Sequence, residues 1–193
     1  MKRTASLKRQ TSETNVNLAL NLDKHSPVKI DTTIPFMDHM LNLFAAHAGI
    51  SLTIKASGDT YIDDHHLVED IGITLGKAIK TALSARKGIV RYGHFLLPMD
   101  EALAYVALDL SNRFYLSYEV NIKFQKTGFD YDLLHEFFYA LAANAGITLH
   151  IKMLKGRNNH HIAESIFKGF GRAFGAAISK TKSKSVPSTK GVL

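Results

Sequence analysis

Asp63-Asp64-His65-His66-Leu67-Val68-Glu69-Asp70 is the stretch around which this chain is organised, because a second copy follows as Asn158-Asn159-His160-His161-Ile162-Ala163-Glu164-Ser165. In each copy two adjacent histidines precede a glutamate, and an apolar pattern with helical spacing follows. On a helix the first histidine and the glutamate share a face, whereas the second histidine points roughly 100° away. One helix can therefore give a His/Glu pair to one metal ion and its other histidine to a second ion.

Composition narrows the classes of protein. The 193 residues suffice for one large domain or two fused small ones, and the repeat favours the second description. The chain has no cysteine, so any metal must be held by imidazole and carboxylate. The net charge of +7 favours anionic partners, but the cations form no stripe interleaved with aromatic residues, and we expect no nucleic-acid partner. The apolar runs are too short to span a membrane and no secretory signal is visible, so we expect a cytoplasmic protein without a membrane partner.

Each half is predicted to have the same order of elements: a hairpin of two strands, a helix, one or two further strands, and a helix that begins at the histidine stretch. His47–Lys55 aligns with Asn144–Lys152, which fixes the register of the repeat. The predicted class is α+β, with helices covering one face of each sheet. The expected strands are 15–23, 28–33, 50–56, 61–62, 102–110, 113–120 and 147–154, and the expected helices are 36–48, 65–85, 130–145 and 160–178. We expect residues 1–8 to be disordered or an arm, 9–88 the first repeat half, 89–179 the second repeat half, and 180–193 a C-terminal tail.

Paired histidines with a glutamate, in register within a repeat, favour a metal site over histidines that are only structural. His39 lies in the first expected helix, and Glu136 occupies the matching place in the second half, next to His135. His39 and Glu136 could each complete the shell of one metal, although Glu136 could equally be a solvated charge. Asp38 could orient an imidazole. The order is not His-Glu-x-x-His, so a zinc protease is a weak interpretation.

Cations and acids outside the repeat are further candidates. Arg91 and Arg113 could bind a phosphate through their guanidinium groups, and Lys168 and the tail sequence Ser188-Thr189-Lys190-Gly191 could join them. Each of these alone is more often a solvated residue. Asp100 and its neighbour Glu101 precede an expected strand, where a general base could stand but where edge charges are also common.

Eight motifs, taken together, resemble those of one family. The chain is similar over about Arg9 to its C-terminus to imidazoleglycerol-phosphate dehydratases of histidine biosynthesis. The motifs are Arg9-x-Thr11-x-Glu13-Thr14, Phe36-Met37-Asp38-His39-Met40-Leu41, Gly58-Asp59, Asp63-Asp64-His65-His66-x-x-Glu69-Asp70-x-Gly72, Arg91-Tyr92-Gly93, Pro98-Met99-Asp100-Glu101, Gly156-x-Asn158-x-His160-His161-x-x-Glu164 and Pro187-Ser188-x-Lys190-Gly191.

The resemblance implies a fold, an assembly and a reaction. The implied fold is a tandem duplication of a ribosomal-protein-S5-domain-2-like half, with two four-stranded sheets and helices packed between them. The implied assembly is a homo-oligomer in which trimers form a shell of twenty-four subunits. The implied reaction is the dehydration of D-erythro-imidazoleglycerol phosphate to imidazole acetol phosphate, with two Mn²⁺ ions per active site. No phosphatase signature precedes Arg9, so we expect a monofunctional enzyme.

The resemblance also implies roles for individual residues. Family members have either histidine or glutamate at the position of Glu136, which leaves that ligand open. The implied catalytic carboxylates are Glu13 above all, with Glu69, Glu164 and Asp100. The implied metal ligands are His39, His65, His66, Glu69, Glu136, His160, His161 and Glu164. The implied contacts to substrate and phosphate are Glu13, His47, Arg91, Arg113, Lys168, Ser188 and Lys190.

The chemistry explains why such residues are needed. The hydrogen that leaves the glycerol chain is not next to a carbonyl, so it becomes acidic only through the imidazole ring. Metals on the two ring nitrogens would activate the ring, and a carboxylate within hydrogen-bond reach would move the protons. Two alternatives remain at this stage: another metal-dependent lyase or hydrolase on the same scaffold, and a non-enzymatic RNA-binding module, for which fold analogy is a weak argument.

Overall fold

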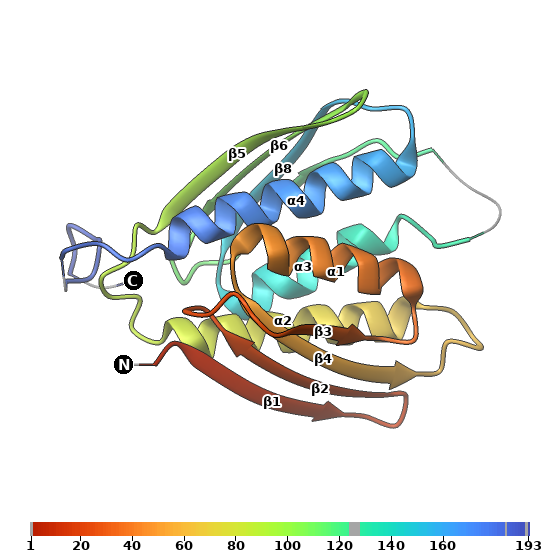
Figure 1. Ribbon diagram of the computed structural model, residues 1–193, viewed down its shortest axis with the longest axis horizontal. Helices are drawn as coiled ribbons and strands as arrows, with labels where there is room; N and C mark the ends of the chain where they lie inside the picture. Colours follow the sequence, from red (N-terminus) through yellow and green to blue (C-terminus); the bar gives the residue numbers. More distant parts are fainter. Residues whose placement is uncertain (1, 124–127, 184, 192) are drawn as a thin grey trace.

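Two four-stranded sheets form the outer layers of the molecule (Figure 1). The computed structural model describes residues 2–123, 128–183, 185–191 and 193. The first sheet has the order β1-β2-β4-β3 and the second β5-β6-β8-β7, so the two halves share one topology. The strands are β1 (Thr4–Gln10), β2 (Thr14–Asn21), β3 (Val28–Asp31), β4 (Ser51–Gly58), β5 (Tyr92–Met99), β6 (Ala102–Asp109), β7 (Tyr115–Glu119) and β8 (Thr148–Lys155).

Four helices lie between the two sheets, as Figure 1 shows, and the predicted α+β architecture is confirmed. Local sequence sets their ends. A proline stands at the start of α1, and left-handed glycines, Gly49 and Gly146, follow α1 and α3. The Asn158 side chain accepts the backbone N–H groups of His160 and His161 and so caps α4. The helices are α1 (Pro35–Ala48), α2 (His65–Leu83), α3 (Leu133–Ala145) and α4 (Asn159–Ile178).

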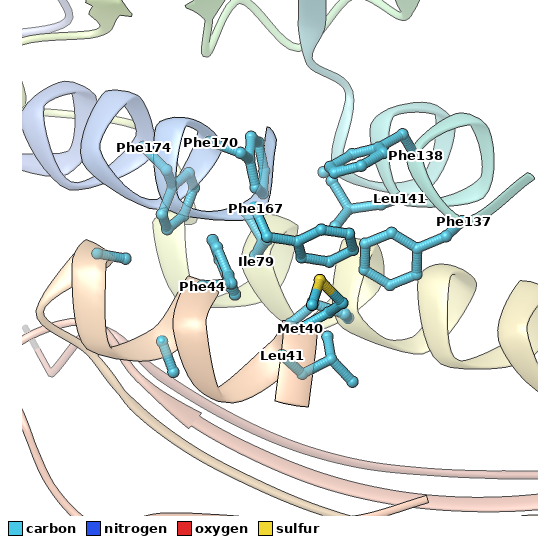
Figure 2. Packing of buried hydrophobic residues seen from close by; sticks show 14 of the residues in the cluster. Met40, Leu41, Phe44, Ile79, Phe137, Phe138, Leu141, Phe167, Phe170 and Phe174 are labelled. Carbon is cyan, nitrogen blue, oxygen red and sulfur yellow. The ribbon is translucent and has the colours of Figure 1, made fainter. Parts of the chain in front are cut away.

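Helix pairs from different halves join the two layers. Helix α2 packs on α3, and α1 packs on α4. Figure 2 shows the aromatic part of this core, where Phe44 of α1 stacks on Phe170 of α4 with ring centroids 5.0 Å apart. Phe137 of α3 likewise stacks on Phe167 of α4 at 5.5 Å. Because these rings are almost completely buried, the two halves share one core.

Glycines allow the paired helices to approach closely at equivalent places in the two halves. A Cβ atom on Gly76 of α2 would lie 2.5 Å from the carbonyl oxygen of Leu141 in α3. A Cβ atom on Gly171 of α4 would lie 2.8 Å from the carbonyl oxygen of Phe44 in α1. Any larger residue would push the helices apart. This close packing sets the distance between helices that carry the candidate ligands.

Two details of strand pairing were predicted wrongly. The strands expected as hairpins, β2 with β3 and β6 with β7, are not neighbours, because β4 or β8 lies between them. β3 and β7 instead run parallel to β4 and β8. Alternation of polar and apolar residues identifies a strand but carries no information about its partner. Residues 61 and 62, expected as a short strand, lie in an exposed turn.

The N-terminal arm is also corrected. Residues 4–8 belong to β1, which pairs with β2 over its whole length, and residue 1 lies outside the described part. β1 buries only Ala5 fully, so its apolar signal is weak. Strand β5 was also not among the predicted strands. Residues 184 and 192 of the expected tail lie outside the residues that the structure describes.

Among the described helices, none has the length and apolar character needed to cross a membrane.

Candidate metal and phosphate sites

One histidine from the first half meets a histidine and a glutamate from the second. His39 of α1 and His160 of α4 both place Nε2 on the same carboxylate oxygen of Glu164, at 2.7 and 3.1 Å. Their ligand atoms all lie within 4.8 Å of one another, and the two imidazole rings stack at 5.6 Å. We call these three residues the His-Glu cluster. His160 and Glu164, the i, i+4 pair predicted from the sequence, therefore lie on the face of α4 that meets His39.

A lysine holds the glutamate of this cluster in its charged form. Lys168, one turn further along α4, donates to the second oxygen of Glu164 at 2.6 Å. Burial opposes ionisation of Glu164, but the hydrogen bonds from Lys168 and His39 outweigh it and lower the pKa of Glu164 to about 2. His47 lies nearby, and burial, with the charges of Lys168 and Arg172, lowers its pKa. Glu164 is therefore a carboxylate ready to accept a cation.

The second histidine of the first stretch faces a different set of acids. His66 Nδ1 lies 3.0 Å from Asp59 Oδ2 and 3.8 Å from Glu13 Oε2. Glu13, Asp59 and His66 also form a group whose ligand atoms lie within 4.8 Å of one another. The hydrogen bond with Asp59 raises the pKa of His66. Glu13, predicted from its motif alone, thus stands beside a predicted ligand although it lies far away in sequence.

The second histidine of the other stretch repeats this arrangement. His161 Nδ1 lies 2.7 Å from Glu101 Oε2, and its Nε2 lies 3.7 Å from Asp100 Oδ2. The hydrogen bond with Glu101 raises the pKa of His161. The same bond, with the backbone N–H of Asn158, lowers the pKa of Glu101 to about 2. In both halves a turn between the first two strands brings an acid to the second histidine.

The remaining predicted ligands do not converge within one chain. His65 begins α2, Glu69 lies half-buried one turn later, and Glu136 lies on α3, where its carboxylate meets His135 Nδ1 at 3.0 Å. In the part of the chain that the structure describes, these three side chains form no cluster of ligand atoms. The two helices nevertheless pack together. The set around the first histidine stretch thus occupies equivalent places but lacks the compact geometry of the His-Glu cluster.

Four predicted phosphate contacts line one cavity of about 700 Å³. Arg91 and Arg113 form one side of it, and the tail, with Ser188 and Lys190, forms another. Arg91 is held by Asp109, which accepts from Nε at 2.7 Å and from a terminal nitrogen at 3.0 Å. Arg91 also donates to the Pro187 carbonyl at 2.8 Å, which ties the tail to β5. We call this cavity the phosphate pocket; Lys168, predicted with these residues, lies instead beside the His-Glu cluster.

Three carboxylates have roles other than those the sequence indicated. Asp38 contacts no imidazole among the described residues: its Oδ1 accepts the backbone N–H and hydroxyl of Thr32 at 2.7 and 2.6 Å and so fixes the loop before α1. Asp59, which holds His66, was not predicted as a site residue, and Glu101, which holds His161, was predicted only as a possible general base or edge charge. Each lies in a motif already noted, Gly58-Asp59 and Pro98-Met99-Asp100-Glu101. The two motifs therefore pointed to these acids, but only the fold shows which histidine each acid contacts.

Comparisons with known proteins agree on one family. The family model for imidazoleglycerol-phosphate dehydratase matches residues 32–174. A protein of that name from Endomicrobium trichonymphae is 69% identical over 99% of this chain and 98% of its own length. Another from Desulforamulus reducens is 53% identical over the full length of both. The crystal structure of the dehydratase from Staphylococcus aureus matches with a TM-score of 0.84 and 42% identity, over 92% of this chain and 99% of that one.

Proposed function

The chain belongs to the imidazoleglycerol-phosphate dehydratase family and is a hydro-lyase of histidine biosynthesis, and from this premise we propose how its residues carry out the dehydration. We propose that the reaction depends on two Mn²⁺ ions per active site. The observation that carries the metal proposal is the His-Glu cluster, where two imidazoles and a carboxylate from different halves of the chain converge.

The donor set fits a first-row divalent metal. Neutral imidazole and carboxylate are ligands of that class, and this chain has no thiolate to favour a softer ion. We propose His39, His160 and Glu164 as ligands of one ion, and His65, Glu69 and Glu136 as equivalent ligands of the other. His66 and His161 lie on a different side of their helices from His65 and His160, and they would complete the coordination shells of the two ions. When bound, the two metals would supply Lewis-acid activation of the substrate's imidazole ring.

Carboxylates of this chain then move the protons. We propose that Glu13, whose side chain is half exposed and close to His66, protonates the departing hydroxyl or takes the proton from the chain carbon. Asp100, close to Nε2 of His161, is the second candidate for this role. Glu164 would serve mainly as a ligand, because Lys168 already holds it in its charged form, and Glu69 would serve as the equivalent ligand in the first stretch. His47 and Lys168 would contact the substrate beside the His-Glu cluster.

The phosphate pocket would fix the other end of the substrate. Arg91, Arg113, Ser188 and Lys190 supply cationic and hydroxyl donors for a phosphate ester. This pocket lies far from the His-Glu cluster of the same chain, however. The backbone N–H of Arg91 donates to the Ala177 carbonyl at the C-terminal end of α4, whereas His160 lies at the N-terminal end (Figure 1). At 1.5 Å per residue these ends are about 25 Å apart.

A three-carbon chain cannot bridge that distance. We therefore propose that each complete active site combines the His-Glu cluster of one subunit with the phosphate pocket of another. Trimers that assemble into a twenty-four-subunit shell, as the family resemblance implies, would provide such contacts. We also propose a cytoplasmic location, because a phosphorylated substrate does not cross membranes freely.

Turnover and metal content test this proposal together. Purified enzyme should dehydrate imidazoleglycerol phosphate, lose activity on chelation and recover it with Mn²⁺. Metal analysis should find two ions per chain in the active enzyme, and the mass in solution should be that of a large homo-oligomer. His65→Ala or His160→Ala should abolish turnover and lower the metal content. Normal turnover with full metal content in either variant would refute the assignment.

Mixing two inactive variants tests whether sites are shared. His160→Ala lacks a metal ligand, and Arg113→Ala lacks a phosphate contact. If each site uses two subunits, oligomers dissociated, mixed and reassembled from both variants will contain some intact sites and recover part of the activity. The control is each variant reassembled alone, which should stay inactive. Mixed oligomers without activity, formed in demonstrated hybrids, would place each site within one chain.

A further inference from the structure

A second basic cavity lies where the two halves of the chain join, at the C-terminal end of α2. Its volume is about 660 Å³. None of its described lining residues is acidic, while Lys2, Arg3, Lys87 and Lys180 supply four cations. The hydroxyl-bearing residues Thr81, Ser84, Thr181 and Ser183 also line it, beside the apolar residues Ala82, Leu83, Ala85 and Ile89. We call it the junction cavity, and its chemistry is that of a binding site for a small anion.

The junction cavity is built like the phosphate pocket. Arg3 directly precedes β1, and Arg91 directly precedes β5, the equivalent first strand of the second sheet. The carbonyl of Arg3 accepts the N–H of Leu22 at 3.0 Å, and that of Arg91 accepts the N–H of Leu110 at 3.1 Å. The two arginines therefore hold equivalent places in the duplicated fold.

Both guanidinium groups are also held in the same way. Arg3 donates to Asp23 from Nε at 3.1 Å and from a terminal nitrogen at 2.7 Å, much as Arg91 donates to Asp109. Each arginine also donates to a backbone carbonyl near the chain's C-terminal end, Ile178 for Arg3 and Pro187 for Arg91. A guanidinium that is already held in the lining of each cavity needs little further ordering when an anion binds.

Asp23 neutralises only part of the charge in the junction cavity. It pairs with Arg3 and with Lys180, the latter at 2.8 Å. Lys2 and Lys87 form no ion pair within the described part of the chain, and both are exposed. Cations near a helix C-terminus do offset its partial negative charge, and Lys80 in the last turn of α2 already serves that purpose. Lys2 and Lys87 thus leave an excess of positive charge facing a concave surface.

We propose that the junction cavity is a second phosphate-binding site, which takes orthophosphate or the phosphate group of a small ester. It is separate from the phosphate pocket, although the tail lines both: Lys180, Thr181 and Ser183 face the junction cavity, and Ser188 and Lys190 face the phosphate pocket. The comparison with the phosphate pocket rests on the proposed function, so the experiment tests the two cavities with different variants.

Equilibrium dialysis of the intact oligomer against radiolabelled orthophosphate counts the sites. The wild-type enzyme should bind two equivalents per chain. Lys2→Gln combined with Lys87→Gln should bind one, with an unchanged KM for the substrate. Arg113→Ala should also bind one, but through loss of the other site. The charge-matched control Lys29→Gln with Lys55→Gln, on the exposed face of the first sheet, should keep two equivalents. Displacement by unlabelled glycerol 3-phosphate or orthophosphate will show which source of phosphate binds more tightly.

Three results would overturn the proposal. One equivalent in the wild type, removed by Arg113→Ala, would leave the junction cavity without a ligand. An equal loss in the Lys29/Lys55 control would mean that overall charge, and no defined site, holds the anion. A raised KM in the Lys2/Lys87 variant would make the cavity part of the catalytic site. If Arg113→Ala keeps two equivalents while the Lys2/Lys87 variant loses one, the phosphate pocket assignment fails and the junction site stands.

Discussion

The two histidine stretches are copies in sequence but differ in how they are arranged in the fold. In the second, His160 and Glu164 meet His39, and Lys168 holds the carboxylate. In the first, His65 and Glu69 meet no such partner among the described residues. Two substitutions account for this: Glu136 occupies the place equivalent to His39, and Ile73 occupies that of Lys168. The duplication therefore keeps the paired histidines and the glutamate, while the residues around them make one group compact and leave the other with two carboxylates and no lysine.

The largest expected effect compares the two glutamates. Glu164→Gln should lower turnover by more than about 100-fold, the upper range for residues that only support a metal ligand, and should remove one metal equivalent. Glu69→Gln should do the same at the other ion. Steady-state kinetics with metal analysis measures both. If one variant keeps full activity, only one half of the duplication holds a catalytic metal.

Substitution of Glu101 and Asp59, the acids that hydrogen-bond to His161 and His66, should have the next largest effect. Glu101→Ala should weaken Mn²⁺ binding by about 10- to 100-fold, because His161 loses the acceptor that orients its ring. Asp59→Ala should weaken it less, since the contact of Asp59 with His66 is longer, at 3.0 Å. Competition with a fluorescent chelator measures the affinity. Glu101→Gln, which keeps an acceptor oxygen, should recover most of it; unchanged affinity in Glu101→Ala would remove the positioning role.

Substitutions at Gly76 and Gly171 compare the packing of α2 on α3 with that of α4 on α1. Gly76→Ala should lower the free energy of unfolding by about 3 kcal/mol, and Gly171→Ala by about 1–2 kcal/mol, because the added methyl meets a carbonyl at 2.5 Å in the first case and 2.8 Å in the second. Denaturant titration of the metal-free protein measures both values. The opposite ranking would mean that α2 and α3 move apart more easily than α1 and α4.

The smallest expected effect is on pH dependence. The pKa of Glu164 is lowered from 4.5 to about 2, so its stabilising contribution is complete above pH 4.5 and is lost as the pH falls towards 2. The Tm of the metal-free protein should therefore fall by a few degrees more between pH 6 and pH 3 in the wild type than in Glu164→Gln. Glu69→Gln is the matched control and should retain the wild-type slope. Equal slopes in all three proteins would show that the Lys168 ion pair does not contribute to stability.

Some of the site was visible in sequence because its signal is local. The i, i+4 spacing places His160 and Glu164 on one helical face whatever surrounds them, and the fold confirms that they share it. The duplication likewise predicted two equivalent layers of helices and sheet. The pairing of β2 with β4, and the inclusion of residues 4–8 in a strand, had no comparable local signal.

By itself, the sequence determined the repeat, the helices that begin at each histidine stretch and the side chains able to bind metal or phosphate, because these follow from periodicity and residue chemistry. Only the tertiary structure decided which residues meet. His39 reaches Glu164 because glycines let α1 and α4 pack closely, and Arg91 lies at the opposite end of α4 because a helix is rigid and long. Contacts between residues more than a hundred positions apart depend on packing of the whole chain, which no local pattern encodes.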